Sequence, residues 1–533
     1  MRFKLRLFSL FAAAVTMLIA NPSAFADGNL HNVKHIIVIM QENHSFDNYF
    51  GALAYAPGSR YHNNGNGCSP DDHGCVNGLT CRTDNAGNLS CYNSNPDDDG
   101  STVLVFHDSR RCAGPDLDHS WFNTHREVNF LFPNNARFED LANGFVRVND
   151  ITEQVDNGVE TATDDQTMGF FTQTDIPFYY SLAQDFALND NYHASVLGPT
   201  FPNRSYLMAA TSFGHLTTSD TFPPPGGYKP ITGTIFDLLE AHNVTWADYF
   251  QDAPQAGSFR TFSFVPGGSD PHLLPLTVFL AQAQSGALPQ VSFVDPNFGL
   301  LGQVFENDEH PPTDIQRGQA YVAQVINAVR NGPNWQDSVI LFTYDEHGGF
   351  YDHARAPRAR QGHAPNPDGI NPGQCADLSN PPLSQQPGNG AECAANLLSL
   401  TDTSENDAQE LCPDFTPNGP YPAACANFDQ YGVRVPFLAI SPFSKQHYVS
   451  HTVGDHTSIL ALIEEVFMTP AASASGDGDT DAEDENQVTN HPFLTKRDQY
   501  ANALLDMFDF NGSPSLNTPI GTANPPINDC TPK

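Results

Sequence analysis

The stretch HIIVIM at residues 35–40 decides the fold class of this chain. It is a continuous run of apolar, largely β-branched residues, which is typical of a strand covered on both faces. Similar runs occur at Val291–Val294, Val339–Thr343 and Val435–Ile440. Strands of this kind predict a sheet that is buried between two layers of helices.

Amphipathic helical patterns alternate with these runs. They lie at Ile235–His242, Asp314–Val329, Ser458–Phe467 and Lys496–Phe508. Strands that alternate with helices form βαβ units. We therefore expect an α/β fold with a mostly parallel central sheet sandwiched between helices. Ligands of such sheets bind beyond the carboxyl ends of the strands, so a site is expected in the segments that follow the apolar runs.

The amino-acid composition limits the classes of partner that this chain can bind. The chain has 533 residues, enough for a large domain with a substantial core, and its 38 Phe and 17 Tyr argue against disorder. The formal net charge of −37 argues against nucleic acid as a partner, because phosphate backbones are bound by clustered Lys and Arg. The same charge disfavours adhesion to anionic membranes.

The N-terminal residues have the pattern of a signal peptide. Arg2, Lys4 and Arg6 precede an apolar run at 7–20, and Ala24-Phe25-Ala26 has the small residues of a cleavage site. No later segment is apolar enough to span a membrane, so no stable membrane anchor is expected. We predict a signal peptide at 1–26, cleaved after Ala26, and a single domain at 27–533. The protein is then secreted or periplasmic.

The ten cysteines agree with export, because disulfides form in oxidising compartments. A cysteine metal site is disfavoured, since the sequence has no CxxC pair. Two clusters and one further cysteine are present: Cys68, Cys75, Cys81, Cys91 and Cys112, then Cys375, Cys393, Cys412 and Cys425, then Cys530. The odd count in the first cluster means that a bridge leaves it or that a thiol stays free.

Three segments have loop composition and are expected to be insertions, at about 56–112, 354–424 and 471–486. The first two carry the cysteine clusters. The third is small and acidic, and its alternating aspartates resemble the start of a calcium loop. However, Ala482 and Val488 stand where an EF-hand requires Gly and Glu, so calcium is disfavoured there.

Polar residues follow two of the predicted strands. Glu42 and Asn43 come directly after the first strand, and Asp345 and Glu346 follow the run that ends at Thr343. Carboxylate and amide oxygens are hard ligands that suit a divalent cation, and a cation relieves the repulsion between adjacent carboxylates. The alternative for the first pair is an ordinary turn with a helix cap. The Gly-Gly after the second pair would let the backbone approach a substrate.

A third segment, GPTFPNRS at 198–205, predicts a nucleophile. Pro202 suits the first turn of a helix, which places Thr200 at the helix N-terminus, where an anion is favoured. A hydroxyl at that position beside a cation can lose its proton and attack phosphorus. The alternative is that Thr200 only caps the helix. The absence of GxSxG, GxxxxGK[ST], HExxH and GxGxxG argues against several other enzyme classes.

These motifs resemble a known family. QENHSFDNYFG at 41–51, LGPTFPNR at 197–204 and DEHGGFYDH at 345–353 are similar to the bacterial and plant phosphoesterase family, which contains non-specific phospholipases C and acid phosphatases. The segment 434–467 resembles its C-terminal motif, and the similarity spans Lys34–Phe467. The resemblance implies an alkaline-phosphatase-like α/β sandwich. One departure is His44, which stands where many relatives have Arg.

The resemblance also implies a role for individual residues. The residues that would bind a divalent metal are Glu42, Asn43, Asp345 and Glu346, together with Thr200 as both ligand and nucleophile. The histidines that would contact the phosphoryl oxygens or the leaving group are His119, His310 and His353. Asn203 and Arg204 would bind substrate. Oxygen ligands are compatible with calcium, magnesium or manganese, whereas resemblance to the superfamily suggests zinc.

The expected function is that of a secreted, metal-dependent phosphoesterase that forms a phosphothreonine intermediate. Phospholipase C-type cleavage of phospholipids is the favoured reaction. One alternative is an acid phosphatase acting on phosphomonoesters, and another is an inactive secreted binding protein of the same ancestry. A sulfatase is disfavoured, because the nucleophile position is Thr and no CxPxR motif is present. Phosphate esters, phospholipids among them, are the expected partners, and the oligomeric state is left open.

Overall fold

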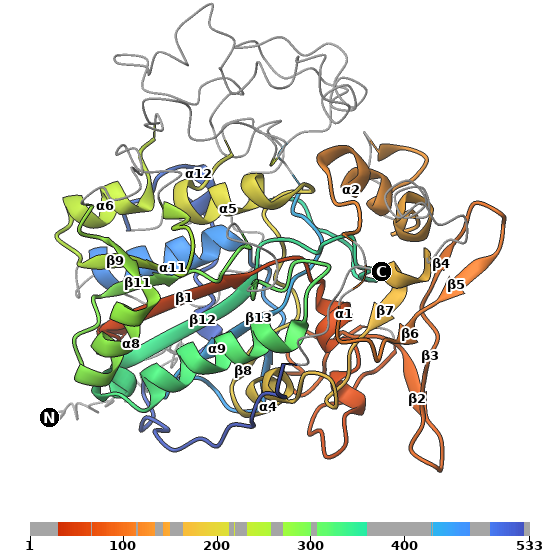
Figure 1. Ribbon diagram of the computed structural model, residues 1–533, viewed down its shortest axis with the longest axis horizontal. Coiled ribbons are helices and arrows are strands. Elements are labelled where there is room, and N and C mark those ends of the chain that lie inside the picture. The colour runs from red at the N-terminus through yellow and green to blue at the C-terminus, as the bar shows by residue number, and fades with distance from the viewer. Residues whose placement is uncertain are drawn as a thin grey trace, which may run out of the picture.

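An eight-stranded sheet forms the centre of the protein in a computed structural model (Figure 1). The structure describes residues 30–65, 67–112, 114, 116–133, 142–149, 164–212, 218, 232–256, 270–299, 306–359, 428, 430–469 and 491–526. The expected signal peptide, most of the insertion at 354–424, the acidic segment at 471–486 and five of the ten cysteines lie outside these residues.

The sheet is mostly parallel. Its order is β10 (Leu273–Pro275), β9 (Trp246–Phe250), β11 (Val291–Val294), β1 (His35–Gln41), β12 (Ser338–Tyr344), β13 (Phe437–Ile440), β8 (Ala187–Asn189) and β14 (Tyr448–Ser450). Neighbouring strands are parallel except at β13, which runs antiparallel to both β12 and β8. β1 lies between two parallel partners, and its apolar run is buried, as expected for a central strand.

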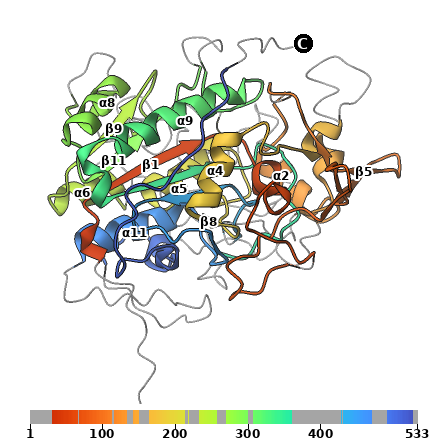
Figure 2. The same cartoon turned by 90° about the horizontal axis from the view of Figure 1, so that it is seen from below.

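Helices cover both faces of the sheet, and Figure 2 shows α8 and α9 on one side of β1 with α6 and α11 on the other. The main helices are α4 (Pro177–Asp185), α5 (Thr200–Ala209), α6 (Ile235–Ala241), α8 (Leu276–Ser285), α9 (Ile315–Arg330) and α11 (His456–Met468). Each contributes buried apolar residues to the larger of two apolar core clusters in the described part of the chain. The expected α/β sandwich is therefore confirmed.

Two expected elements are shorter than predicted. The run at Val435–Ile440 begins as a strand only at Phe437, because Pro436 has no N–H to donate to a neighbouring strand. The expected helix at Lys496–Phe508 is wrong over most of its length. It consists of α12 (Lys496–Gln499) and a 3-10 turn at Leu505–Met507, and the left-handed backbone at Leu504 (φ 56°) interrupts the helical pattern.

The first expected insertion carries short hairpins and disulfides. The hairpins pair β2 (Cys81–Thr83) with β3 (Leu89–Cys91) and β4 (Ser94–Pro96) with β5 (Thr102–Leu104). Disulfides join Cys68 to Cys75 and Cys81 to Cys91. Cys112 is disulfide-bonded as well, so the alternative of a free thiol in this cluster is wrong. The predicted disulfide-bearing loop is confirmed.

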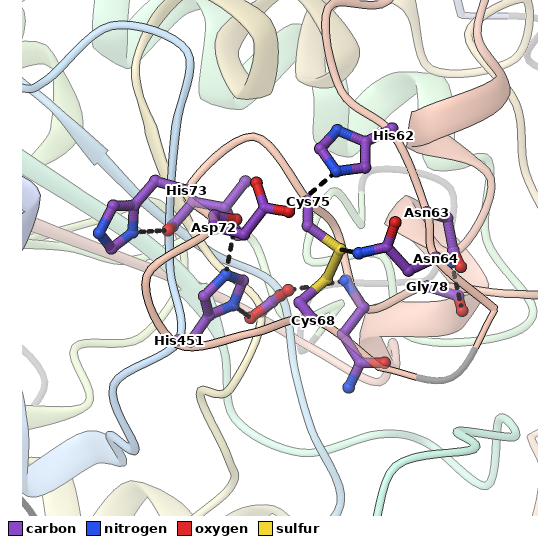
Figure 3. The surroundings of a disulfide bond; sticks show 12 residues. His62, Asn63, Asn64, Cys68, Asp72, His73, Cys75, Gly78 and His451 are labelled. Carbon is purple, nitrogen blue, oxygen red and sulfur yellow. Dashed lines mark hydrogen bonds and ion pairs between the residues drawn. A yellow bond between two sulfur atoms is a disulfide. The ribbon is translucent and has the colours of Figure 1, made fainter.

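The loop closed by Cys68–Cys75 covers the edge of the central sheet. Figure 3 shows His73 and His451 beside this disulfide. The backbone N–H of Val449, on the edge strand β14, donates to the carbonyl oxygen of His73 over 2.9 Å, and the carbonyl of Val449 contacts His73 Nδ1 at 2.9 Å. Covering an edge in this way removes a free template for pairing with another chain.

Candidate active site

The expected metal-binding residues meet at the carboxyl ends of β1 and β12. Gln41 and Tyr344 are paired at the last position of these strands, so the residues that follow them are neighbours. The backbone N–H of Asn43 donates to Oδ1 of Asp345 over 3.4 Å. Glu42, Asn43, Asp345 and Glu346 are all buried. Side chains 302 positions apart in sequence thus form one polar cluster.

Glycines make this close approach possible. Gly348 and Gly349 both have positive φ, at 61° and 74°. A Cβ atom on Gly348 would lie 2.4 Å from the carbonyl oxygen of Asn43, and one on Gly349 would lie 2.5 Å from Cβ of Leu117. Because the two glycines have no Cβ, the segments that carry Asn43 and His119 can pack directly against them. The approach of a substrate to these glycines stays a prediction.

Arg204 lies between two of the expected metal ligands. It projects from α5, its Nε donates to Oδ2 of Asp345 over 2.8 Å, and its Nη2 donates to Oε1 of Glu42 over 3.0 Å. The guanidinium is buried and also lies over the ring of Phe298, 5.1 Å from its centroid. Its nearest polar partners are thus carboxylates of the cluster rather than solvent.

Asn203 shapes the loop in front of α5. Its Oδ1 accepts from the N–H of Val196 over 3.0 Å, and its Nδ2 donates to the carbonyl oxygens of Gly198 and Pro199 over 2.7 and 3.1 Å. The side chain is fully buried. These contacts make Asn203 a residue that positions the Thr200 turn, which is a different task from the substrate binding expected of it.

Thr200 is the first residue of α5, and it follows Pro199 at the N-cap position. It does not itself cap the helix, so the capping alternative does not describe this residue. Thr200 and Arg204 are four positions apart and lie on the same face of the helix. Because Arg204 enters the carboxylate cluster, this spacing directs Thr200 to the same side, at the positive end of the helix dipole.

Two of the three expected histidines join the cluster. His119 and His310 lie with Asp116 in a group whose ligand atoms are all within 4.8 Å of one another. His119 Nε2 is 3.7 Å from Oε1 of Glu346. The Nδ1 atoms of the two histidines contact the carbonyl oxygens of Leu117 and Pro311, which leaves Nε2 of each ring on the side of the carboxylates.

His353 is placed elsewhere. Its Nδ1 contacts Oδ2 of Asp47 at 2.6 Å, and its Nε2 contacts Oδ1 of Asn77 at 3.2 Å. Asp47 also accepts from the fully buried Arg434. The described contacts of His353 thus belong to a second ionic network, and the structure does not bring it together with Thr200 and the four metal candidates.

His44, the departure from the family pattern, is a packing residue. Its ring is fully buried and stacks on Tyr49 and Phe350, with centroid distances of 4.3 and 5.0 Å. Burial lowers the pKa of His44 to about 3, so the imidazole is neutral. The substitution therefore adds no charge to the site.

The electrostatics of the cluster are set by burial and crowding. Burial raises the pKa of Glu346 to about 8, and that of Glu42 is raised for the same reason, against the opposing effect of Arg204. Burial alone would lower the pKa of His119, but the neighbouring Glu346 and Asp116 raise it to about 10. The neighbouring carboxylates therefore favour the protonated form of His119, which can donate a proton.

Buried oxygen atoms without partners make the cluster suitable for a cation. Within the described residues, Oδ1 and Nδ2 of Asn43 and Oε1 of Glu346 are buried and have no hydrogen-bond partner. Unpaired buried polar atoms are costly, and carboxylate and amide oxygens are the ligands of hard divalent ions. The donor set thus fits a divalent metal, and the group of Asp116, His119 and His310 could also hold one.

Sequence reasoning missed several acidic residues around the site. Asp295 follows β11 directly and is paired with Asp248 of β9; burial raises the pKa of Asp295 to about 6. Burial raises the pKa of Glu306 and that of Asp308, and the nearby carboxylate of Glu42 raises each of them further. The signal for Asp295 was present, because it directly follows a strand, as Glu42 and Asp345 do.

Comparison with known proteins identifies the family. The sequence profile described as "Phosphoesterase family" matches residues 33–470. The chain belongs to the phosphoesterase family. Non-specific phospholipase C6 of Arabidopsis thaliana is 27% identical over 496 residues, covering 92% of this chain and 74% of the relative. Phospholipase C B of Mycobacterium tuberculosis (strain ATCC 25618 / H37Rv) is 26% identical over 493 residues, covering 87% of this chain and 78% of the relative.

The solved structures are less similar to this phosphoesterase in sequence than these relatives are. A protein in the alkaline phosphatase superfamily from Vibrio parahaemolyticus is 12% identical with a TM-score of 0.26, covering 54% of this chain and 60% of its own. Human ectonucleotide pyrophosphatase / phosphodiesterase 5 is 10% identical with a TM-score of 0.27, covering 55% and 90%. The sequence comparisons confirm the expected family and the expected enzyme class, a hydrolase acting on phosphate esters.

Proposed function

We propose that this phosphoesterase is a secreted, metal-dependent phospholipase C that works through a phosphothreonine intermediate. The relatives named above as phospholipases C support the substrate class. The observation that carries the mechanism is the placement of Thr200 at the N-terminus of α5, on the helix face from which Arg204 reaches Glu42 and Asp345. A predicted signal peptide at 1–26 and the disulfides support export.

The metal would be held by Glu42, Asn43, Asp345, Glu346 and the hydroxyl of Thr200. A divalent cation bound there polarises phosphoryl oxygens and lowers the pKa of a hydroxyl that it contacts. Arg204 binds one oxygen of Glu42 and one of Asp345. The other oxygen of Glu42, Oδ1 of Asn43 and Oε1 of Glu346 are then the candidate ligands, together with Oδ1 of Asp345, which also accepts from two backbone N–H groups. Zinc, calcium, magnesium and manganese are all compatible with this donor set.

The chain's own residues account for the proton movements. In the first step the Oγ1 alkoxide of Thr200, the form that a bound cation would favour, bonds to phosphorus, and the bond from phosphorus to the diacylglycerol oxygen breaks in line. His119, whose protonated form the neighbouring carboxylates favour, gives its proton to that departing oxygen. In the second step water attacks the phosphorus bound to Thr200, and His119 accepts the proton of the water. The bond from phosphorus to Oγ1 breaks, and Thr200 is released as the alkoxide that starts the next cycle. The N-terminus of α5 and the His310 side chain stabilise charge on the phosphoryl oxygens.

The test combines a nucleophile variant with product analysis. Thr200→Ala should reduce hydrolysis of phosphatidylcholine and of p-nitrophenyl phosphorylcholine by more than about 1,000-fold, since a nucleophile supplies most of the acceleration. Thr218→Ala is the matched control: Oγ1 of Thr218 accepts from the N–H of Phe201 in the first turn of the same helix, so this variant removes a nearby hydroxyl without removing the nucleophile. It should stay within about tenfold of wild type.

Two further readouts complete the test. Rapid acid quench and mass spectrometry of a Thr200 peptide should show an added phosphocholine group, the part of the substrate that stays on Thr200 after the first step, in wild type only. Release of phosphocholine supports phospholipase C cleavage, whereas exclusive release of free phosphate from monoesters would make the protein a phosphatase instead. Thr200→Ala with near wild-type turnover in metal-replete protein would rule out the nucleophile assignment.

A further inference from the structure

An exposed apolar tip lies at the far end of the helix that follows His119. Of the six most exposed large apolar side chains in the described residues, four fall between positions 92 and 132: Tyr92, Leu104, Leu131 and Phe132. Leu131 is 67% exposed and Phe132 is 55% exposed, the two largest values of the six. Adjacent exposed Leu and Phe side chains are unfavourable in water, so such a tip marks a contact surface.

Two arginines pack on the aromatic residues that precede this tip in the chain. Arg126 lies over Phe122 and Phe130, with 5.7 and 4.4 Å from its guanidinium carbon to the ring centroids. Arg147 lies 5.0 Å from the centroid of Phe130, and its Nε is 3.4 Å from Oδ1 of Asp98. Both guanidinium groups are therefore held beside aromatic rings. We call Leu131 and Phe132, with the supporting residues Phe122, Arg126, Phe130 and Arg147, the α2 tip.

The α2 tip is joined directly to the active site. Helix α2 (Trp121–Val128) starts at its cap Ser120, next to His119, and ends just before Phe130. Eight residues of helix span about 12 Å, so the tip lies roughly that far from the catalytic histidine along one rigid element. Figure 1 shows α2 beyond the carboxyl ends of β1 and β12, on the side of the hairpins.

We propose that the α2 tip docks this enzyme on a phospholipid bilayer. Leu131 and Phe132 enter the boundary between headgroups and acyl chains, and Arg126 and Arg147 contact the lipid phosphates. Cationic side chains beside exposed aliphatic and aromatic residues are the chemistry that an interfacial segment uses. The net charge of −37 specifies a zwitterionic surface, because an anionic bilayer would repel the rest of the protein. This inference rests on the proposed function, since it brings phospholipid to the site.

The experiment compares two double variants of the full chain. The test variant is Leu131→Ser with Phe132→Ser. The matched control is Leu516→Ser with Phe493→Ser, which removes the same residue types at positions that are 45% and 43% exposed and lie outside residues 92–132. Binding to phosphatidylcholine vesicles is measured by co-sedimentation with EDTA present. Hydrolysis is measured on the same vesicles and on the water-soluble p-nitrophenyl phosphorylcholine.

We expect the test variant to bind vesicles and to hydrolyse their lipid at least about tenfold more weakly than wild type. Turnover of the soluble substrate should stay within about twofold, and the control should match wild type in all three assays. As a second variant, Arg126→Gln should weaken vesicle binding by about threefold without a change in soluble turnover.

Three results would overturn the inference. In the first, the test variant binds vesicles as wild type does. In the second, the control variant loses binding to the same extent. In the third, sedimentation velocity shows that wild type is a dimer and that the test variant is a monomer, which would make the tip an interface between copies. Failure of the proposed function is distinct: wild type would then hydrolyse neither substrate, while co-sedimentation would still decide whether the tip binds lipid.

Discussion

Nε of Arg204 donates to Oδ2 of Asp345 over 2.8 Å, at a point where both side chains are buried. The same guanidinium reaches Glu42, so one positive charge neutralises part of the negative charge that the cluster presents. Burying several carboxylates together is costly unless cations share the site. Arg204 and a metal ion therefore have related tasks, and removing one should increase the effect of the other.

Arg204→Met is expected to lower the free energy of unfolding by about 3 kcal/mol, because it leaves Glu42 and Asp345 without their buried partner. A divalent cation should restore part of this loss. The measurement is the melting temperature with and without millimolar metal, and the metal-induced increase should be larger in the variant than in wild type. Arg204→Met should also lower phosphoesterase activity, because it disturbs the two carboxylates that are proposed to hold the metal.

Arg497→Met is the matched control for this prediction. Arg497 is also buried and pairs with Asp455, which lies outside the proposed metal site and, within the described residues, outside the other groups that could hold a cation. It should be destabilised to a similar extent and gain no more from metal than wild type does. An equal metal response in both arginine variants would contradict a cation at the Glu42–Asp345 cluster.

Gly348→Ala should disrupt the site through two effects. The left-handed backbone costs an alanine about 1 kcal/mol, and its Cβ would lie 2.4 Å from the carbonyl oxygen of Asn43, which must then move. We expect a total loss of about 3 kcal/mol in unfolding free energy and at least about a 100-fold decrease in kcat/KM. Urea unfolding and steady-state kinetics measure the two quantities.

Gly87→Ala separates the clash from the backbone strain. Gly87 also has positive φ, at 88°, but no atom lies within 4 Å of the position of an added Cβ. This variant should lose only about 1 kcal/mol and keep wild-type kcat/KM. Similar kinetic effects in both variants would show that the approach of Asn43 to Gly348 is unimportant for catalysis.

The sheet could be predicted because its signal is local. An uninterrupted apolar run such as HIIVIM has few alternatives to a buried strand, and the polar residues at its end must then face the ligand-binding edge. The prediction of a helix at Lys496–Phe508 was wrong for the opposite reason. Its pattern suits a helix, but the chain turns at Leu504 to meet the tertiary structure, and a local pattern does not contain that constraint.

The residues that form the site could be predicted from the sequence, but the partner of each charged side chain could not. Adjacency of strands brings Glu42 and Asp345 together, and that order follows from the fold. The partner of a buried charge is decided by three-dimensional packing: Arg204 could equally have faced a substrate, and His353 pairs with Asp47 from a distant part of the chain. Residue type and spacing do not distinguish these outcomes.

Glu309→Gln tests a carboxylate that supports the segment carrying His310. The hydroxyls of Tyr49, Tyr179 and Tyr344 all donate to Glu309, over 2.6, 2.5 and 2.7 Å. Burial raises the pKa of Glu309 to about 7, although the phenols lower it. At pH 8 the glutamine should cost about 2 kcal/mol in unfolding free energy, because an amide nitrogen cannot accept from a phenol.

Glu306→Gln is the control for Glu309. Glu306 is three positions away and is also buried, and burial raises its pKa to about 7, but the three phenols donate to Glu309. Urea unfolding at pH 8 should show that Glu306→Gln is neutral or stabilising, since it removes a buried negative charge. The tyrosine contacts would be without consequence if both variants changed stability equally.

Asp498→Asn should remove part of the pH dependence of stability. Asp498 lies at the start of α12 and is fully buried, and its carboxylate accepts from the N–H groups of Leu494 and Thr495. Burial raises its pKa to about 6 from an ordinary value of 3.8. Between these values the folded chain binds more protons than the unfolded chain, so this group lowers the free energy of unfolding as pH rises from about 4 to above 6. Asparagine does not titrate, and the stability of wild type relative to Asp498→Asn should therefore fall by about 2 kcal/mol between pH 4.5 and 7.5. Urea unfolding of both proteins at matched pH values measures this difference and cancels the titrating groups that do not interact with Asp498. Because Asp498 also raises the pKa of Glu464, both proteins carry Glu464→Gln in this comparison. A difference that stays constant over this range would show that the proton affinity of Asp498 is the same in the folded and unfolded chains.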